Sequence, residues 1–434
     1  MLDITKQNIK FLDDHPAFCV LAFTHLRVQV KDIWEGFEIL GRASSLCCSA
    51  PSPVEVELNS SLNDIIQHND FDTERKMFYA NKLPSQCENV CSLNYKNPAC
   101  KPEENQTKRE IVNEMYIDTI SYEKVFKQPE LKIIDYNFGN ECNLACRMCS
   151  SGSSNQIAIL ASKADNAEKL IEFGIINEEN DNNFFLRKGS PANIEAIKEV
   201  LPNLNELQFA GGEPFVSKDV EDILLAAIES RDNEHIDLEI TTNGTKFIEE
   251  KLDIFLKFRK VHFIVSIDGT DLTYDYIRYP FTFKIIEKRL KDIVDYIIRN
   301  NLEERVDFTF ACVGVLYNLY DYEKLYSFLS NIFNKLSNEP ISMEISDVYG
   351  NGGDMHALSW NNIPNDLLND ALLSYKETTD DWYLIFKEYV INRTQDAQSK
   401  GITYAKEHTL LLDKLHERTY HDYLHPKLVK YIND

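Results

Sequence analysis

The chain lacks any apolar run approaching the roughly 18 residues that a membrane-spanning helix needs. Its first residues, Met1 to Lys6, lack the basic segment and apolar stretch of a secretory signal peptide. Positive charge is also scarce, since 46 Lys and Arg stand against 70 Asp and Glu and give a net charge of −24. Phosphate backbones are bound by clustered Lys and Arg, and no long basic run is present. The sequence therefore predicts a protein with no membrane anchor and disfavours nucleic acid as a partner.

The 434 residues include 43% hydrophobic and 27% charged positions, which predicts folded domains, two or three in number, rather than disorder. Ten cysteines in a chain without a secretory signal indicate a reducing, cytoplasmic setting. Grouped cysteines in that setting serve as metal or catalytic sites more often than as disulfides. The excess of carboxylates suits a cationic substrate or a basic peptide, or it forms only a soluble surface.

Three cysteines stand close together at Cys142, Cys146 and Cys149, in a C-x3-C-x2-C pattern. Cubane iron–sulfur clusters are held by cysteine thiolates, usually four. Three ligands leave one iron without a protein partner, and an open metal position can bind a small molecule. Two other interpretations are half of a structural zinc site, which needs a second nearby pair of Cys or His, and chance clustering.

This pattern resembles the cluster-binding signature of the radical S-adenosylmethionine (SAM) superfamily. The resemblance implies that Cys142, Cys146 and Cys149 hold a [4Fe-4S] cluster whose open iron chelates the amino and carboxylate groups of SAM. An electron from the cluster then breaks the sulfonium C–S bond, and the resulting 5′-deoxyadenosyl radical removes hydrogen from a substrate. A flavodoxin- or ferredoxin-type protein is the implied electron donor.

Strand and helix patterns alternate between residues 126 and 350. Strands are expected near 131–138, 206–209, 237–242, 261–267, 306–313 and 341–348. Helices are expected near 155–164, 192–200, 217–229, 246–258, 283–299 and 322–336, whereas 166–192 is charged and irregular and indicates an insertion or loop. Alternation of this kind predicts an α/β fold with a parallel sheet and right-handed crossovers. Six strands match the partial (β/α)6 barrel of radical SAM enzymes.

Polar motifs follow three of these strands, where ligands bind in parallel sheets. They are Gly211-Gly212-Glu213-Pro214, Thr241-Thr242-Asn243-Gly244 and Ser266-Ile267-Asp268-Gly269. The first resembles the family's GGEP motif, which contacts the SAM amino group. The resemblance gives the carboxylate and ribose of SAM to the second motif and the ribose hydroxyls to the third. The alternatives are a turn for the first motif and helix caps for the other two.

Weaker assignments come from the same resemblance. Arg278 would hold the SAM carboxylate, with a surface ion pair as the alternative. Val315 would pack on adenine, and Asn318 would donate or accept a hydrogen bond. Cys312 lies within an apolar strand and is expected to be a core thiol rather than a ligand.

The first 125 residues form a predicted cysteine-rich domain that ends in a helical connector over 107–130. Period-two alternation up to Val30 and a second strand near 37–40 predict a β-hairpin with cysteines at its outer ends, followed by a polar loop and a helix over 61–68. This arrangement resembles the twitch module, a domain of some radical SAM enzymes that holds an auxiliary [4Fe-4S] cluster. The implied ligands are Cys19, Cys47, Cys87 and Cys91, with Cys48 and Cys100 as alternatives. A zinc-stabilised module is the other interpretation.

Residues 351–434 are expected to be mostly helical, as a cap on the barrel or an oligomerisation surface. Three functions remain open from the sequence. The first is a radical SAM enzyme with a peptide or amino-acid-like substrate, whose auxiliary cluster anchors the substrate or relays an electron. The second is the same chemistry on a sugar or nucleotide metabolite. The third is a non-catalytic zinc or iron–sulfur binding protein.

Overall fold

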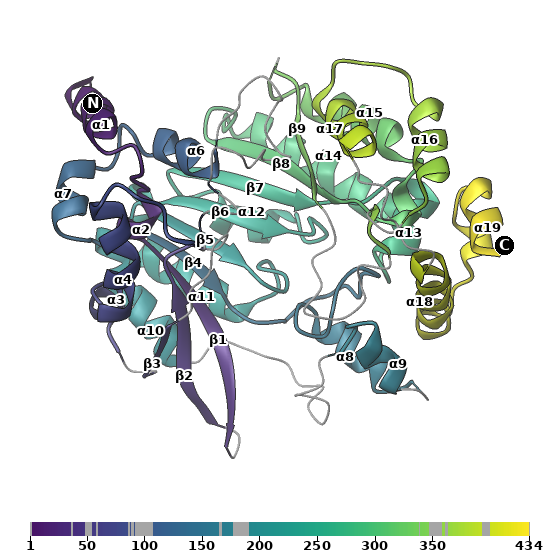
Figure 1. Cartoon of the computed structure of the whole chain (residues 1–434), viewed down its shortest axis with the longest axis horizontal. Coiled ribbons are helices and arrows are strands. Elements are labelled where there is room, and N and C mark those ends of the chain that lie inside the picture. Colours follow the sequence, from purple (N-terminus) through teal and green to yellow (C-terminus); the bar gives the residue numbers. More distant parts are fainter. Residues whose placement is uncertain are drawn as a thin grey trace.

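The computed structural model describes residues 2–35, 38–47, 54–57, 60–85, 87, 91, 107–164, 167–176, 191–337, 339–346, 358–360, 363–392 and 400–433. These residues form a nine-stranded sheet in the order β3-β2-β1-β4-β5-β6-β7-β8-β9, with helices around it (Figure 1). The N-terminal helices lie beside the starts of the central strands. The C-terminal end of the chain lies on the far side of the molecule, beyond the other ends of these strands (Figure 1).

The six strands predicted for the barrel are all present and parallel, with small shifts at their ends. They are β4 (Ile133–Asn137), β5 (Glu206–Ala210), β6 (Asp237–Thr242), β7 (Lys260–Ser266), β8 (Val306–Val313) and β9 (Ser342–Ser346). Between them lie α8 (Asn155–Ala161), α9 (Ala167–Glu172), α10 (Pro191–Val200), α11 (Lys218–Ser230), α12 (Glu249–Phe255), α13 (Asp271–Ile277), α14 (Phe283–Arg299) and α15 (Tyr322–Phe333). Helix α9 lies in the segment expected to be irregular, and residues 177–190 of that segment lie outside the described residues.

The two faces of the sheet differ in character because side chains alternate along each strand. Leu207, Phe209, Leu238 and Ile240 belong to one face and pack in a hydrophobic core with residues of the surrounding helices. The opposite face carries the residues between them, such as Gln208 and Glu239, which are polar and half-buried. We call this second face the inner face of the sheet.

The N-terminal hairpin is present, but it is part of the main sheet. Strand β1 (His25–Glu35) pairs antiparallel with β2 (Glu38–Ser45), as predicted, and the turn between them lies outside the described residues. Strand β1 also pairs in parallel with β4, so seven strands of the sheet run in parallel. The loop expected after the hairpin includes a short strand, β3 (Val54–Glu57), which pairs with β2 at the edge of the sheet. Alternation predicts a strand but does not name its neighbour, which is why the pairing with β4 was not foreseen.

Short helices cover the N-terminal ends of the central strands. They are α1 (Leu2–Asp14), α2 (Leu21–Thr24), α3 (Leu62–Ile66), α4 (Asn69–Tyr79), α6 (Lys108–Met115) and α7 (Tyr122–Lys127). A second hydrophobic core forms there around Phe18, Phe23 and Tyr122. The predicted connector is helical because Thr107 and Glu110 form a capping box, in which each side chain accepts from the other's backbone N–H at 2.7 and 3.3 Å.

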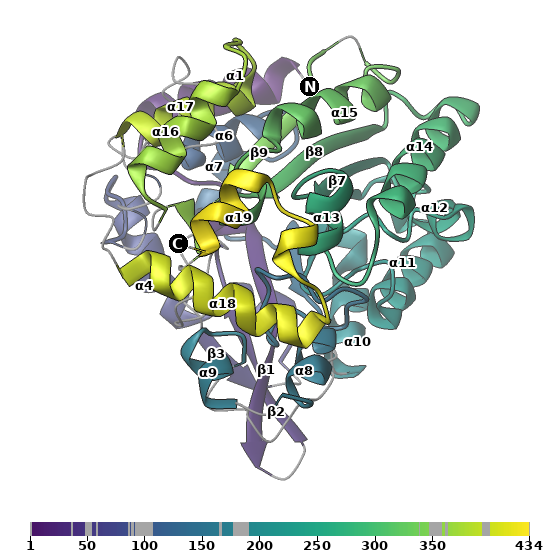
Figure 2. The same cartoon turned by 90° about the vertical axis from the view of Figure 1, so that its right-hand side faces the viewer.

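Four helices follow the last strand among the described residues: α16 (Asn365–Ser374), α17 (Asp381–Asn392), α18 (Lys400–His416) and α19 (Pro426–Asn433). Helix α17 packs beside β9 and α15, and α16 packs beside α17, whereas α18 lies next to α8 (Figure 2). The glycine-rich loop expected at 349–354 lies outside the described residues. In the described part of the chain, every helix is too short or too polar to cross a bilayer.

Candidate active site

The three cysteines of the C-x3-C-x2-C motif lie together on the loop that follows β4. Cys146 is buried, and Cys142 and Cys149 are half-buried. A hydrogen bond between Cys146 and Cys149 lowers the pKa of Cys146 and raises that of Cys149. Burial, together with the neighbouring Cys146, raises the pKa of Cys142 to about 12. The predicted trio is therefore brought into one site at the C-terminal edge of the sheet.

The donor atoms that these residues supply bear on the choice between zinc and an iron–sulfur cluster. Among the described residues, no three Cys, His, Asp or Glu side chains converge closely enough to hold a single metal ion. A zinc ion needs its ligands within about 2.3 Å of one point. In a cubane cluster each thiolate binds a different iron, so the thiolates stand farther apart. Cys142, Cys146 and Cys149 supply three thiolates on one loop, a donor set that fits a [4Fe-4S] cluster with one open iron.

The cysteine loop is held by backbone hydrogen bonds to two other segments. The Cys142 N–H donates to Asn155 Oδ1 at 3.0 Å, which fixes the loop to the start of α8. On the other side, Ala145 N donates to Tyr279 O at 2.7 Å and Arg147 N donates to Ile277 O at 3.0 Å. The segment that follows α13 therefore forms the second wall of the loop.

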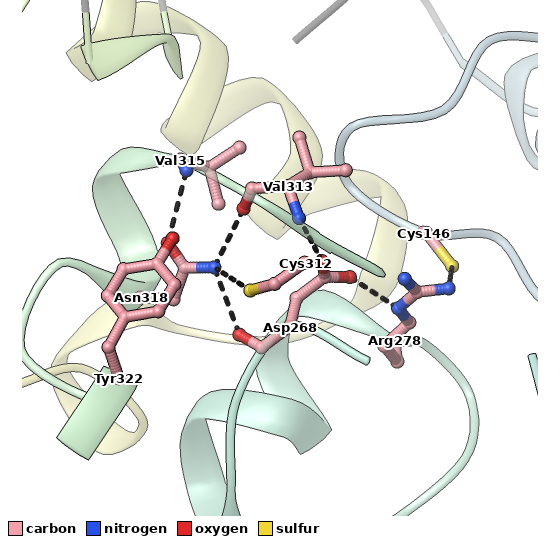
Figure 3. Close-up of polar contacts among 8 residues, drawn as sticks. All are labelled: Cys146, Asp268, Arg278, Cys312, Val313, Val315, Asn318 and Tyr322. Atoms are coloured by element: carbon pink, nitrogen blue, oxygen red, sulfur yellow. Dashed lines mark hydrogen bonds and ion pairs between the residues drawn. The ribbon is translucent and has the colours of Figure 1, made fainter. Parts of the chain in front are cut away.

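Nitrogen donors approach two of the sulfur atoms. Leu144 N lies 3.4 Å and Asn243 Nδ2 lies 4.0 Å from Cys142 Sγ. Arg278 Nη1 lies 3.8 Å from Cys146 Sγ (Figure 3). N–H groups directed at sulfur stabilise thiolates and tune the potential of an iron–sulfur cluster.

The glycines of the Gly211-Gly212-Glu213 segment approach the start of the cysteine loop. Gly212 N donates to Gly139 O at 2.9 Å, and Glu213 N donates to Glu141 O at 2.7 Å. A Cβ on Gly212 would lie 2.1 Å from the carbonyl oxygen of Glu141, and Gly211 has a positive φ of 133°. In this structure these glycines allow close approach of residues 139–141.

Glu213 is fully buried and joins the ends of two strands. Its carboxylate accepts from Thr242 Oγ1 at 2.7 Å, Asn243 N at 2.7 Å and Phe215 N at 3.2 Å. Burial raises the pKa of Glu213 to about 7, against these hydrogen bonds. The carboxylate therefore connects the ends of β5 and β6. Within the motif, Gly211 and Gly212 reach the surface.

Asn243 connects the end of β6 to the cysteine loop. Its Nδ2 donates to Asn143 Oδ1 at 2.9 Å, and its Oδ1 accepts from Thr245 N at 3.0 Å. The next helix, α12, begins after Ile248, so Thr242 and Asn243 do not cap it. Asn143 was not singled out from the sequence, because an Asn between cysteines gives no signal of its own.

Asp268 and Arg278 form a buried ion pair beside Cys146, with Arg278 Nε 2.5 Å from Asp268 Oδ2 (Figure 3). The other oxygen of Asp268 accepts from Val313 N at 2.8 Å. The residue that caps α13 is Thr270, so the cap proposed as an alternative for Asp268 is absent. Arg278 is 6% exposed, which excludes the surface ion pair proposed for it. Ser266 is half-buried at the end of β7.

The loop after β8 is organised by Asn318. Its Nδ2 donates to Val313 O at 2.8 Å and to Asp268 O at 3.1 Å, and its Oδ1 accepts from Val315 N at 3.1 Å (Figure 3). Val315 is fully buried, and its expected contact with adenine stays a prediction. Cys312 is fully buried, as expected of a core thiol.

The N-terminal cysteines gather at the opposite edge of the sheet. Cys19, Cys47 and Cys87 pack against the same hydrophobic core. Burial, with Cys91 nearby, raises the pKa of Cys19 to about 11. Burial, with Cys19 and Cys91 nearby, raises the pKa of Cys87 to about 12. Cys48 and Cys100 lie outside the described residues.

Helix α6 holds the backbone around Cys19. Asn113 Oδ1 accepts from Val20 N at 2.8 Å, and Asn113 Nδ2 donates to Phe18 O at 2.8 Å. Arg109 donates to Pro16 O, and its charge acts to lower the pKa of both Cys19 and Cys87. Helix α6 is therefore part of this second cysteine site. The sequence had indicated only that this helix links two domains.

A row of polar side chains crosses the inner face between the two cysteine sites. Arg27, Asp135, Gln208, Glu239 and His262 are register partners on five adjacent strands. Arg27 Nε lies 3.5 Å from Asp135 Oδ2, and His262 Nδ1 lies 3.4 Å from Glu239 Oε2. The two carboxylates of this row each face a basic partner, and the polar groups at this level give the inner face hydrogen-bonding capacity.

Glu206 lies two residues before Gln208 on β5, and its environment predicts that the free energy of unfolding depends on pH. Burial, with Glu239 and Asp237 adding to it, raises the pKa of Glu206 from 4.5 to about 7. Between these values the folded chain holds a proton that the unfolded chain has lost, so stability must fall as pH rises from 4.5 to about 7. Glu206→Gln, which stays neutral, should escape a loss on the order of 3 kcal/mol. Urea unfolding at a series of pH values measures the difference.

Asp222→Asn is the matched control, since Asp222 forms an exposed ion pair with Lys218. Its stability should follow the pH curve of the wild type. Parallel curves for Glu206→Gln and the wild type would contradict the prediction. They would show that burial beside Tyr116, whose hydroxyl donates to Glu206 at 2.8 Å, does not raise the pKa of Glu206.

The comparisons with known proteins show a similarity over the central part of the chain. Residues 136–329 match the family model described as the Radical SAM superfamily. This segment contains the cysteine trio, the three strand-end motifs and Arg278. This segment is therefore similar to the radical SAM superfamily.

Individual relatives are distant. The radical SAM cyclopropyl synthase TigE of Paramaledivibacter caminithermalis is 23% identical over 281 residues, which cover 62% of this chain and 52% of TigE. This chain thus spans about half the length of that curated relative. A crystal structure of Streptococcus suis SuiB bound to SAM has 15% identity and a TM-score of 0.37, and covers 82% of this chain and 68% of that one. SuiB bound to its precursor peptide SuiA has 15% identity and a TM-score of 0.33, over 71% of this chain and 60% of that one.

Proposed function

We propose that the chain reductively cleaves SAM at a [4Fe-4S] cluster held by Cys142, Cys146 and Cys149. The observation that carries this proposal is the union of three segments at one edge of the sheet. The cysteine loop is bonded to the Gly212 segment through Glu141, and to the end of β6 through Asn143 and Asn243. When bound, the reduced cluster supplies the electron that converts SAM into methionine and a 5′-deoxyadenosyl radical.

The protein's own residues supply position and electrostatics around this chemistry. Asn243 and Arg278 direct N–H groups at the cluster ligands Cys142 and Cys146. Gly211 and Gly212 present backbone to the SAM amino group, with Glu213 behind them. Thr242, Ser266 and Asp268 surround the same edge and are the proposed partners of the SAM carboxylate and ribose. For Asp268 a ribose contact would use a second lone pair, since each oxygen already accepts one hydrogen bond.

A second [4Fe-4S] cluster is proposed on Cys19, Cys47, Cys87 and Cys91, within a twitch-like region that spans residues 1–125. The nearness of Cys19, Cys87 and Cys91, and the shared core around Cys47, support it. This region precedes the barrel, 126–350, and the helical cap, 351–434. Because the two cysteine sites lie at opposite edges of the sheet, a substrate on the inner face would lie between them. The second cluster would then anchor substrate or relay an electron from a flavodoxin- or ferredoxin-type donor.

The proposed substrate is a peptide or amino-acid-like molecule. The net charge of −24 favours a basic partner, such as a peptide that carries ammonium or guanidinium groups. A sugar or nucleotide metabolite is the alternative, which the hydrogen-bonding groups of Gln208 and His262 also suit. Transfer of deuterium into 5′-deoxyadenosine from labelled candidates of each class would decide between them.

The overall proposal is tested on protein prepared and reconstituted without oxygen. We expect about eight irons per chain if both clusters are present. Addition of dithionite and SAM should release 5′-deoxyadenosine. Zinc without iron, or iron without release of nucleoside, would contradict the proposal and favour a non-catalytic binding protein.

Cys87→Ala tests the second cluster separately. We expect iron content to fall by about half, because one of two four-iron clusters loses a ligand. Release of 5′-deoxyadenosine should persist in part, because the cysteine trio is intact. Cys312→Ala, which removes a buried core thiol, is the control and should keep the full iron content. An unchanged iron content in Cys87→Ala would remove Cys87 from the ligand set.

A further inference from the structure

Helix α18 lies outside the segment that matches the radical SAM family model, yet its buried face lies against the cysteine loop. Leu412 of this helix shares a hydrophobic core with Ala145 of the loop and Ile157 of α8. An ion pair between Lys169 and Glu407, 2.8 Å apart, joins α9 to α18. Figure 2 shows α18 beside α8 and α9.

Arg147 reaches from the cysteine loop into this contact. It lies between Cys146 and Cys149 in the chain, and its side chain is 0% exposed. Its Nη2 donates to Asp413 Oδ1 of α18 at 2.7 Å, and its Nε donates to Tyr276 O at 2.8 Å. The guanidinium also lies over the ring of Tyr276, 3.5 Å from the ring centre. A buried cation of this kind depends on its carboxylate partner.

Asp413 uses both carboxylate oxygens within the protein. Besides Arg147, Oδ1 accepts from the Tyr276 hydroxyl at 2.7 Å, and Oδ2 accepts from Tyr420 N at 2.8 Å. One carboxylate therefore ties together the cysteine loop, the end of α13 and the turn that follows α18.

Asp413 holds the chain segments on both sides of Cys146 through Arg147 and Tyr276. The segment after Tyr276 supplies the carbonyl groups of Ile277 and Tyr279 that accept from the cysteine loop. It also supplies Arg278, whose Nη1 contacts Cys146 Sγ. The carboxylate of Asp413 is the anionic partner of the buried guanidinium, which otherwise donates to the Tyr276 carbonyl and lies over the Tyr276 ring. Loss of Asp413 would release the loop and the opposite wall together.

We propose that Asp413 is a positioning residue for the cluster-binding loop, acting through Arg147 and Tyr276. The inference rests on the proposed function in one respect, since the loop is taken to hold the SAM-cleaving cluster. It predicts that a residue of the C-terminal region, remote in sequence from the radical SAM domain, fixes the geometry of Cys146, Cys149 and Arg278.

The first test uses the apoprotein and needs no cluster. Cys146 is 4% exposed, so it should be alkylated slowly by iodoacetamide in the wild type, as followed by mass spectrometry. Asp413→Asn should raise this rate at least tenfold, while the rate at Cys312, 0% exposed and distant in sequence, stays unchanged. Equal acceleration at both cysteines would indicate general unfolding and overturn the proposal. Tyr276→Phe removes only one hydrogen bond to Asp413 and should give a smaller increase in the alkylation rate of Cys146. This variant provides the test if Asp413→Asn does not fold.

The second test uses the reconstituted holoprotein. Asp413→Asn should lose most of the change that SAM induces in the electron paramagnetic resonance spectrum of the reduced cluster, and should bind SAM at least tenfold more weakly. Arg147→Met/Asp413→Leu, which replaces the buried pair by apolar groups, should recover part of both signals relative to Asp413→Asn. Asp370→Asn, which breaks an exposed ion pair with Lys427, is the control and should match the wild type.

The two tests separate the inference from the proposed function. If the wild type binds no four-iron cluster at the trio, the proposed function fails, and the alkylation rates still report whether Asp413 positions the loop. If the wild type binds the cluster and Asp413→Asn keeps wild-type alkylation rates, spectra and SAM affinity, the inference fails alone.

Discussion

Replacing Cys142 by alanine should reduce the formation of 5′-deoxyadenosine by at least about 10³-fold, the order of loss seen when a group essential to the chemistry is removed. The reason is that in the proposed function Cys142 is one of only three protein ligands of the cluster; its sulfur lies 4.0 Å from Asn243 Nδ2. No other cysteine of the described chain lies within this loop except Cys146 and Cys149. The measurement is chromatographic detection of the nucleoside after addition of dithionite and SAM under anaerobic conditions.

The control for this prediction is Cys312→Ala, since Cys312 is buried in β8 and holds no cluster in the proposed function. It should retain most of the wild-type rate and its iron. Iron content provides a second readout, and Cys142→Ala should retain only the iron of the N-terminal site. Normal nucleoside formation in Cys142→Ala would show that SAM is cleaved elsewhere or by another ligand set.

Gly212→Ala should be the most damaging single-methyl change in the barrel. The added Cβ would lie 2.1 Å from the carbonyl oxygen and 2.5 Å from the carbonyl carbon of Glu141, and backbone atoms cannot turn aside as a side chain can. Relief would require the Gly212 segment to separate from the cysteine loop, with loss of the bond from Glu213 N to Glu141 O. We expect the free energy of unfolding to fall by about 3 kcal/mol or more. SAM cleavage should be lost even in the fraction that stays folded.

Chemical unfolding of the apoprotein measures the first effect, and nucleoside release measures the second. Gly244→Ala is the comparison, because its Cβ would meet the end of the Ile286 side chain at 3.0 Å, which can move. Its cost should be about 1 kcal/mol, mainly from its φ of +69°. A Gly212→Ala protein as stable and active as the wild type would mean that the two segments are not in contact.

Most of the barrel could be predicted from the sequence because its signals are local. Apolar strands such as Val261 to Ile267 and helical periodicity such as that of Phe283–Arg299 depend only on neighbouring residues. The motifs at the strand ends follow from the same alternation, which places them at one edge of the sheet. The cysteine trio, the Glu213 segment and Asn243 are therefore close in space as expected.

What the sequence could not supply are contacts between distant segments. The pairing of β1 with β4 joins residues about a hundred positions apart, and no local pattern records it. Asp413 lies 266 positions from Arg147, and a charged residue in a helical stretch is usually at the surface. Asp268 was assigned to a ligand or a helix cap and Arg278 to a ligand or a surface ion pair, whereas in the structure they form a buried ion pair with each other. For the two ion pairs, the deciding factor is which buried charge needs a counter-charge, and this depends on the assembled fold.

The continuity of β1 with β4 limits how the chain can be divided. A shortened protein that began near residue 126 would leave β4 as an open rim, with the backbone groups that now bond to β1 exposed to water. Bare strand margins of this kind invite association between molecules. The cysteine-rich region is therefore expected to prevent aggregation of the rest of the chain, because its strand β1 covers β4.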